Sequence, residues 1–277
     1  MILVTGATGF VGQKILQLCQ DVIACPSLRN ATEEDVLRIV EESGADAIIH
    51  TAAISDIGTC AADPEASYFA NVQLPVYLAK AAKHAKLICF SSDQVYSGME
   101  EDGPYTEDAV KPGNLYAQQK LEMEQRVLDI APEAVMLRAE WMYDYYLKKP
   151  NYLMNILRAT ETVSFSSRQY RGITYVKEVA ENMGNVLRLP GGIYNFGSET
   201  AKSMYEITQE FLALIGKSVA LEDAPPRHNL WMNCDKAKRF GVIFSDVGDG
   251  LRKCAEDYQL LAALRDEGSA KSGKPIC

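Results

Sequence analysis

The start of the chain constrains its fold most strongly, because an apolar run, Ile2–Thr5, passes directly into a segment with three glycines. A short apolar run that ends in glycines indicates a buried strand followed by a tight turn, and the residues from Val11 onward have helical spacing. In such a turn Gly6 would make the bend, Gly9 would let the backbone approach a ligand, and Gly12 would bring helix and strand close together. The sequence therefore predicts a strand–turn–helix unit.

The same turn is a candidate binding site for a pyrophosphate. Phe10 and Val11, at the start of the predicted helix, would present backbone N–H groups and the positive end of the helix dipole. The hydroxyl of Thr8 can donate a hydrogen bond to a phosphate oxygen. A purely structural turn is the alternative, but the strand before the glycines and the helix after them favour a dinucleotide site.

The first half of the chain alternates short apolar runs with helical patterns. This alternation favours right-handed crossovers and a parallel sheet that is covered on both faces. Thr32 before Glu33, and Asp63 before Pro64, are suitable helix caps. We therefore expect an α/β fold, a doubly wound parallel sheet of the Rossmann type, with the dinucleotide-binding domain over residues 1–145. Buried strands are predicted at 2–5, 22–25, 46–50, 86–91 and 134–138, and helices at 11–20, 33–43, 65–85 and 114–130.

The pattern loosens after Trp141. Helices near 151–159 and 203–215 and a strand at 192–196 are expected there. We expect residues 146–265 to contribute a small substrate-binding lobe, with the chain crossing back to the Rossmann core. Residues 266–277 are expected to form a disordered tail, because 268–275 are small, polar and charged.

Composition excludes several classes of function. A net charge of −9 over 277 residues offers no basic field to a nucleic acid. The seven cysteines are scattered and odd in number, which indicates reduced thiols and a cytoplasmic protein. No segment resembles a signal peptide or a membrane span, and the three histidines are too far apart in sequence to predict a metal site. A homodimer is compatible with the sequence.

Cofactor choice is usually decided near the end of the second strand of such a fold. A carboxylate there contacts the ribose 2′-hydroxyl of NAD, whereas an arginine accommodates the 2′-phosphate of NADP. The strand predicted at 22–25 ends without an acid and Arg29 follows shortly after it. NADP(H) is therefore favoured over NAD(H). The alternative is that Arg29 points into solvent.

Three further residues form a catalytic candidate. Tyr116 and Lys120 are four residues apart in a helical run, so their side chains project from one face, and Ser92 ends a predicted strand upstream. The Lys120 ammonium can lower the pKa of the phenol and hold the nicotinamide ribose, and the Ser92 hydroxyl can donate to a carbonyl oxygen. The set suits reduction of a carbonyl beside a nicotinamide, with Tyr116 as the proton donor. An ordinary solvated helix face is the alternative for the Tyr–Lys pair.

With these motifs the chain resembles the extended short-chain dehydrogenases/reductases, and among them the branch like dTDP-4-dehydrorhamnose reductase. The resemblance covers roughly residues 1–255. It implies that Ala52, Ala53 and Asn71 also contact the cofactor, and that Trp141, Tyr143 and Asn151 contact the substrate. It rests on 52–53, 63–65, 70–72, 90–96, 104–108, 111–112, 137–143 and 151–152 as well as on the glycine turn and the Ser–Tyr–Lys set.

The chain also departs from the family pattern. The dehydratases of the superfamily have Asp-Glu after the catalytic hydroxyl residue, but here Asp93 is followed by Gln94. An amide is no general base, so dehydration is not expected. Glu140 replaces a small hydroxyl residue, and the segments 168–174 and 227–228 differ as well. These changes lie on the substrate side and leave the sugar undetermined.

The same segments hold candidate substrate ligands. Arg171 and Arg227 could grip the diphosphate of a nucleotide sugar, because guanidinium matches phosphate geometry. Ordinary surface ion pairs are the alternative for both arginines. Trp141 and Tyr143 could wall a sugar pocket or could equally be core aromatics.

The resemblance favours one function and leaves two others open. The favoured function is an NAD(P)H-dependent reductase of a 4-keto sugar nucleotide. An epimerase or another carbonyl reductase on the same fold is one alternative. The other is a regulatory subunit like the β subunit of methionine adenosyltransferase, since a fold can keep a site while serving another role.

Overall fold

The structure, a computed structural model, describes residues 1–146, 150–225 and 227–261. These residues form two compact units. The first comprises 1–140, 176–197 and 228–243, and the second comprises the described residues of 141–175, 198–227 and 244–261. The tail predicted at 266–277 lies outside the described residues.

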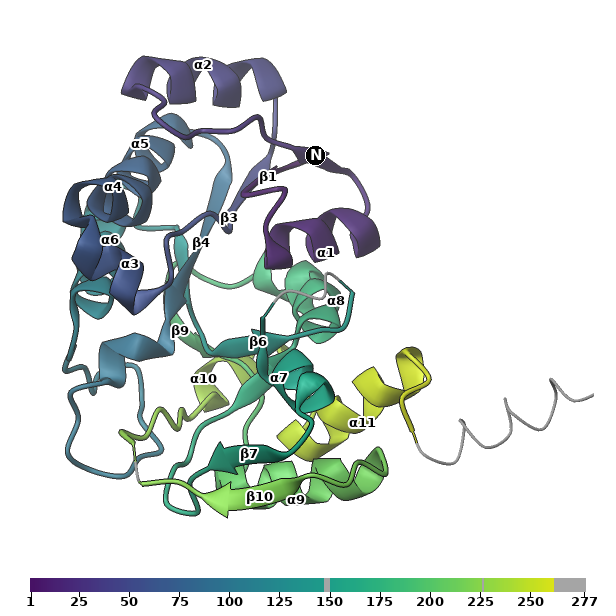
Figure 1. Cartoon of the computed structure of the whole chain (residues 1–277). Helices are drawn as coiled ribbons and strands as arrows, with labels where there is room; N and C mark the ends of the chain where they lie inside the picture. The colour runs from purple at the N-terminus through teal and green to yellow at the C-terminus, as the bar shows by residue number, and fades with distance from the viewer. Residues whose placement is uncertain (147–149, 226, 262–277) are drawn as a thin grey trace, which may run out of the picture. The chain divides into compact units, whose positions relative to one another are not determined.

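The first unit is built on a six-stranded sheet in which every neighbouring pair is parallel (Figure 1). The strands alternate with helices along the chain, as the sequence predicts. The order across the sheet is β2 (Val22–Ala24), β1 (Ile2–Thr5), β3 (Ala47–His50), β4 (Lys86–Ser92), β5 (Val135–Ala139) and β9 (Gly192–Phe196).

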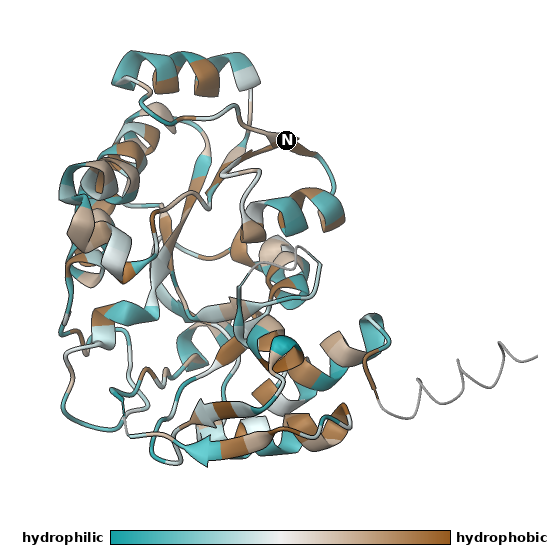
Figure 2. Cartoon of the chain, viewed as in Figure 1, coloured by the Kyte–Doolittle hydropathy of each residue, from teal (hydrophilic) through white to brown (hydrophobic). Residues whose placement is uncertain are grey.

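Helices cover both faces of this sheet. On one face, α1 (Phe10–Leu18) packs against α8 (Val176–Val186). On the other, α2 (Glu33–Ser43), α5 (Leu74–Ala81) and α6 (Leu115–Ile130) bury an apolar cluster with the strands. Figure 2 shows the resulting two-sided character of α2, in which hydrophobic and hydrophilic residues alternate along the ribbon.

Local sequence signals explain where several helices begin and end. Thr32 caps α2 in a reciprocal capping box with Asp35, and Gly44, at φ +59°, ends the helix in the left-handed region. The helix predicted at 65–85 is instead three consecutive pieces. They are α4 (Pro64–Tyr68), a π-helix η1 (Phe69–Gln73) and α5, with Asp63 as the cap of α4. π-Helical turns often occur at functional sites.

Short elements complete the first unit. The helix α3 (Ile57–Ala62) follows β3, the 3-10 helix η2 (Asp93–Tyr96) follows β4, and α10 (Asp235–Lys238) lies in the last segment. An isolated parallel bridge between Tyr105 and Met232 ties that segment to the loop after η2.

The second unit pairs segments that are far apart in the sequence. One two-stranded parallel sheet joins β6 (Trp141–Tyr143) to β8 (Ile173–Tyr175), and another joins β7 (Thr162–Phe165) to β10 (Ala220–Asp223). An aromatic core that includes Tyr143, Tyr152, Tyr175 and Phe211 holds these pairs against the helices. The helices are α7 (Tyr152–Arg158), α9 (Met204–Leu214) and α11 (Val247–Asp257).

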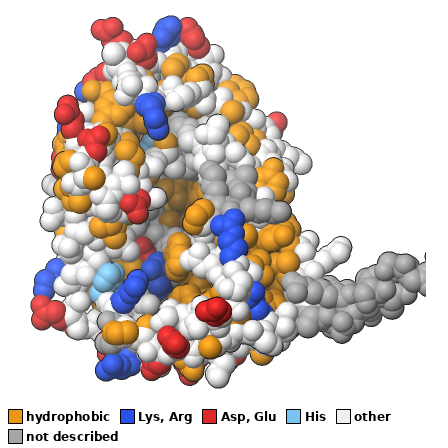
Figure 3. Space-filling view, in the orientation of Figure 1, with side chains coloured by type: hydrophobic (Ala, Val, Ile, Leu, Met, Phe, Trp, Pro, Cys, Tyr) orange, Lys and Arg blue, Asp and Glu red, His pale blue; other side chains and the backbone are white. Residues whose placement is uncertain are grey.

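The surface and the helices carry two further observations. Acidic and basic side chains are interspersed over the face shown in Figure 3. Within the described parts of the chain, the helices are too short or too polar to cross a membrane.

Candidate active site

The glycine turn between β1 and α1 is closely packed. Gly6 has φ +68°, and a Cβ atom there would lie 2.7 Å from the backbone nitrogen of Ala52. A Cβ on Gly12 would lie 2.3 Å from the carbonyl oxygen of Gly6. Both distances are far below a normal contact, so only glycine fits at these two positions. The predicted roles of Gly6 in the bend and Gly12 in close packing agree with this geometry.

The turn also leaves the start of α1 open to a ligand. The N-cap of α1 is Gly9, which has no side chain to occupy the first N–H groups, and no acidic residue lies in the first turn. Thr8 is exposed and Phe10 and Val11 are half-buried. Such a helix start binds anions through its N–H groups and its dipole. The segment therefore fits a pyrophosphate, although the contacts of these residues with a cofactor stay predictions.

The loop after β3 supports the glycine turn. The Thr51 hydroxyl donates to the Thr5 carbonyl at 2.8 Å, and Ala52 packs against Gly6. The buried amide of Asn71, in η1, accepts from the Ile54 N–H at 3.0 Å and donates to the Ile54 carbonyl at 2.9 Å. Asn71 thus holds the loop that carries Ala52 and Ala53. These hydrogen bonds explain why an asparagine stands at this position even if its side chain does not contact the cofactor.

Arg29 is exposed on the loop that follows β2, as its predicted role requires. The preceding Leu28 is buried and anchors this loop in the core of the first unit. The exposure of Arg29 is compatible with a contact to a 2′-phosphate and equally with a side chain that points into solvent.

The three catalytic candidates come together in the first unit. Ser92 ends β4 and caps η2, accepting from the Gln94 N–H at 3.2 Å. Tyr116 lies in the first turn of α6, which Asn114 caps, and the nearby Ser92 hydroxyl favours its phenolate form. Lys120 follows one turn later, with its ammonium nitrogen 5.9 Å from the centre of the Tyr116 ring. All three catalytic candidates are buried.

Burial dominates the ionisation of this set. It raises the pKa of Tyr116, and the neighbouring Ser92 hydroxyl only partly opposes that shift. Burial also lowers the pKa of Lys120 to about 8, against the opposing effect of nearby Cys89 and Glu124. The direction for Tyr116 is opposite to the one expected from the lysine alone, because desolvation of the phenolate is the largest effect on its pKa.

His50 is a buried residue of this region that the sequence did not single out. It lies at the end of β3, beside Thr5 and Cys89 in the sheet register, and its Nδ1 is 2.7 Å from the Thr5 hydroxyl. Its Nε2 is buried without a hydrogen-bond partner. Burial, with a contribution from Lys120, lowers the pKa of His50 to about 3, so the imidazole is neutral. Among the described residues, no group of three or more His, Cys, Asp or Glu side chains could hold a metal ion.

The predicted substrate residues lie in the second unit. Arg171 is half-buried and stacks over the half-buried Trp141, at 5.6 Å from the ring. Tyr143 is fully buried and stacked on Tyr175, which favours its interpretation as a core aromatic. The Asn151 side chain caps α7 by accepting from the Met154 N–H at 3.1 Å.

Arg227, the last of the predicted substrate residues, is exposed. A substrate contact of any residue in the second unit stays a prediction.

Comparison with known families decides what this arrangement belongs to. The family model described as the RmlD substrate binding domain matches residues 1–229, most of the chain. The chain belongs to this family. The predicted resemblance to the branch like dTDP-4-dehydrorhamnose reductase, and the Rossmann-type fold, are both confirmed.

The relatives of this chain include dTDP-4-dehydrorhamnose reductases and methionine adenosyltransferase 2 beta subunits. A dTDP-4-dehydrorhamnose reductase from Mycolicibacterium smegmatis is 35% identical over 150 residues, 51% of this chain and 46% of that protein. The methionine adenosyltransferase 2 subunit beta of Xenopus laevis is 31% identical over 234 residues, 74% of this chain and 69% of that protein. The structure of dTDP-4-dehydrorhamnose reductase from Bacillus anthracis, in complex with NADP, has a TM-score of 0.81 at 19% identity, over 92% of this chain and 98% of that one.

The structure shows what the residues that depart from the family pattern contact. The Gln94 side chain accepts from the Asn114 amide at 3.2 Å, so it supports the cap of α6. Asp93 is buried and accepts from the Ser92 hydroxyl at 3.2 Å. Glu140 is buried against Gly197, where a Cβ would lie 2.4 Å from its carboxyl carbon. Glycine at 197 therefore makes room for the larger residue at 140.

Proposed function

We propose that this protein is an NAD(P)H-dependent reductase of a 4-keto sugar nucleotide. The observation that carries the proposal is that the buried residues Ser92, Tyr116 and Lys120 come together, with Lys120 one turn after Tyr116 on the same helix. This set lies in the same unit as the glycine turn at Gly6 and Gly12. The relatives named as reductases support the assignment.

The glycine turn and the start of α1 would hold the dinucleotide. Their fit is physical, because the missing side chains at Gly6 and Gly12 leave the backbone closely packed and Gly9 leaves the helix start uncapped. When bound, a nicotinamide supplies the hydride for carbonyl reduction.

The catalytic residues supply the proton and stabilise charge. The Ser92 hydroxyl donates to the substrate carbonyl oxygen, where negative charge develops during reduction. The raised pKa of Tyr116 keeps the phenol protonated at neutral pH, as a proton donor must be. Lys120, with a pKa of about 8, is largely cationic at pH 7 and stabilises the phenolate that remains after proton transfer.

NADP(H) is the proposed cofactor in preference to NAD(H). The NADP complex of the Bacillus anthracis neighbour supports NADP as a ligand of this fold. The preference itself depends on Arg29, which is exposed on the loop after β2. The end of β2 has no acidic residue that would favour NAD.

Arg171 and Arg227 are the proposed ligands of the substrate diphosphate. Stacking on Trp141 restricts the guanidinium of Arg171, which reduces the entropy lost when it binds a phosphate. Truncation of either arginine should then raise the KM for the nucleotide sugar and leave cofactor affinity intact.

A non-catalytic regulatory subunit is the second candidate function. The similarity to the Xenopus laevis methionine adenosyltransferase 2 subunit beta favours it. The two candidates are separable, because a regulatory subunit binds a partner enzyme whether or not Tyr116 is present. An epimerase, the third alternative, would keep its cofactor through purification, whereas a reductase exchanges it in each turnover.

A screen of cofactor oxidation tests the proposal. NADPH and NADH are each incubated with the protein and a panel of freshly generated 4-keto sugar nucleotides, and absorbance loss is followed with and without substrate. The proposal expects substrate-dependent oxidation that Tyr116→Phe removes. No oxidation with any member of the panel, together with binding to a methionine adenosyltransferase catalytic subunit, would favour the regulatory function.

A further inference from the structure

A buried ion pair lies directly behind the catalytic candidates. Arg138, on β5, and Glu124, on α6, are each 1% exposed. The guanidinium donates to both carboxylate oxygens, from Nε to Oε1 at 2.9 Å and from Nη2 to Oε2 at 2.7 Å. This bidentate arrangement fixes the angle between the two side chains as well as their distance.

The carboxylate of Glu124 also bonds the strand that carries Ser92. The hydroxyl of Ser91, the neighbouring residue on β4, donates to Glu124 Oε1 at 2.5 Å. Glu124 therefore joins three elements, because its own helix α6 is tied to β4 through Ser91 and to β5 through Arg138.

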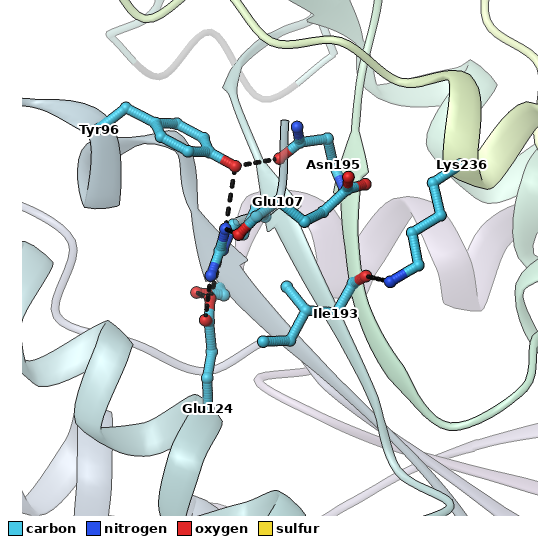
Figure 4. Close-up of polar contacts among 8 residues, drawn as sticks. Tyr96, Glu107, Glu124, Ile193, Asn195 and Lys236 are labelled. Carbon is cyan, nitrogen blue, oxygen red and sulfur yellow. Dashed lines mark hydrogen bonds and ion pairs between the residues drawn. The ribbon is translucent and has the colours of Figure 1, made fainter. Parts of the chain in front are cut away.

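The other side of the guanidinium is anchored just as firmly. Arg138 Nη1 donates to the Tyr96 phenol at 2.9 Å and to the Glu107 carbonyl at 2.6 Å. Tyr96 in turn donates to the Asn195 side chain at 2.6 Å, and the Asn195 N–H donates to the Glu107 carboxylate at 2.9 Å (Figure 4). Arg138 is thus held between η2, the following loop and β9, and it cannot follow α6 if that helix shifts.

The catalytic residues occupy the two elements that Glu124 connects. Tyr116, Lys120 and Glu124 follow one another at intervals of four residues along one stripe of α6. Ser91 and Ser92 are adjacent on β4. A slide of α6 along the sheet would move the Tyr116 phenol away from Ser92 and would break the hydrogen bonds of Glu124 at the same time.

We propose that Glu124, held by Arg138 and Ser91, is a positioning residue that sets where Tyr116 and Lys120 stand relative to Ser92. The inference rests on the proposed reductase function, in which these three groups act on one carbonyl. A buried ion pair by itself contributes little net stability, since desolvation offsets much of the attraction. Its bidentate geometry does fix position, and displacement of a catalytic group by about 1 Å can cost about a hundredfold in rate.

Ser91→Ala is the most informative variant. It removes the Ser91–Glu124 hydrogen bond between β4 and α6 and leaves both the ion pair and the bond from Lys120 to the Phe90 carbonyl intact, so the protein should fold. Glu124→Gln removes the charge as well and leaves Arg138 unmatched, which makes loss of folding a risk for that variant alone. Glu122→Gln is the matched control on the same helix, because Glu122 also pairs with an arginine, Arg126, and accepts from a hydroxyl, that of Tyr68, but is 43% exposed.

The measurements separate positioning from folding. For each variant, kcat per NADPH-binding site, KM for NADPH, Tm and the solvent deuterium isotope effect on kcat are compared with the parent. If Glu124 is a positioning residue, Ser91→Ala should lose about tenfold or more in kcat, because a small displacement of Tyr116 would slow proton transfer by that much. The KM for NADPH should be unchanged and the isotope effect should rise, because proton transfer from Tyr116 becomes slower than other steps. Glu122→Gln should match the parent.

Two outcomes would overturn the inference. A Ser91→Ala enzyme with parental kcat per site and parental isotope effect, beside an inactive Tyr116→Phe, would leave the reductase function standing and remove the positioning role. A parent protein that oxidises neither cofactor with any 4-keto sugar nucleotide would remove the reductase function and this inference with it.

Discussion

Lys120 donates a 2.7 Å hydrogen bond from its ammonium group to the carbonyl oxygen of Phe90, two residues before Ser92. This bond and the burial of the lysine hold the cation close to the strand end where Ser92 lies. The ammonium is therefore held in one position, from which it can stabilise the Tyr116 phenolate and contact a cofactor ribose.

The first prediction removes this cation. Lys120→Met keeps the length of the side chain but loses the charge, so both kcat and NADPH affinity should fall. The fall in kcat should reach roughly two decades, the lower range for a group that supports acid catalysis. Single-turnover rates and calorimetric titration with NADPH measure the two effects. Lys80→Met, which removes an exposed lysine paired with Glu33, is the control and should change neither.

The second prediction tests the packing of the glycine turn. A Cβ in Gly12→Ala would meet the Gly6 carbonyl, which is backbone and cannot move aside without opening the turn. NADPH binding should be lost or severely weakened in a calorimetric titration. Gly184→Ala in α8 is the matched control, since its Cβ would meet nothing within 4 Å. That control should keep binding and gain about 0.5–1 kcal/mol of stability, the usual cost of glycine within a helix. Parental NADPH affinity in Gly12→Ala would make the segment only a structural turn.

The third prediction concerns cofactor choice. If Arg29 meets the 2′-phosphate, Arg29→Ala should weaken NADPH binding by about 1.5–3 kcal/mol, the worth of a charged hydrogen bond, and leave NADH binding unchanged. Dissociation constants for both cofactors are compared in the parent and the variant. Arg38→Ala removes an exposed arginine of α2 that pairs with Asp35, and should alter neither constant. If the ratio of the dissociation constants for NADPH and NADH is unchanged in Arg29→Ala, Arg29 does not contact the 2′-phosphate.

Elements with local signals were predictable from the sequence, and those that depend on distant segments were not. The span of α2 was predicted residue for residue because the helical pattern of 33–43 and the cap at Thr32 before it are local signals. The π-helical turn within the helix predicted at 65–85 carries no comparable mark. The strands β6, β7, β8 and β10 are three or four residues long and pair with segments far along the chain, so no periodicity could develop in them.

The candidate site shows the same division. Ser92, Tyr116 and Lys120 were predictable because their spacing fixes a strand end and one helix face. The direction of the Tyr116 pKa was not, because burial is a tertiary property. Glu124 and Arg138 did leave a signal, an arginine inside an apolar strand and a glutamate in step with the catalytic stripe. Only the structure shows that they pair.

The fourth prediction follows from the buried imidazole of His50. The folded-state pKa of His50 is about 3, below the ordinary value of 6.5. Between pH 6.5 and pH 3 the imidazole therefore binds a proton in the unfolded chain but not in the folded protein. Stability contributed by the neutral ring is therefore lost as the pH falls from 6.5 towards 3, by up to about 1.4 kcal/mol per pH unit.

Urea unfolding at a series of pH values between 7 and 4 measures this dependence. His50→Asn should be less stable than the parent at pH 7, because the contact with Thr5 changes, but its stability should fall less steeply with acid. His84→Asn alters an exposed histidine and should keep the parental slope. Equal slopes in His50→Asn and the parent would show that other groups govern the acid response.

The last prediction addresses the proton donor. Tyr116→Phe keeps the ring and its packing but removes the hydroxyl beside Ser92. Turnover should fall by roughly two to four decades, the usual worth of a positioned acid. Tm and NADPH affinity should barely change, because the ring remains and the glycine turn is untouched. Tyr77→Phe, in which a tyrosine on α5 that packs against the core of the first unit is changed, is the control for loss of a phenol and should retain parental turnover. Single-turnover rates with the substrate found in the screen decide the matter. If Tyr116→Phe reduces that substrate at the parental rate, the phenol is not the acid, and the regulatory function becomes the better account of this chain.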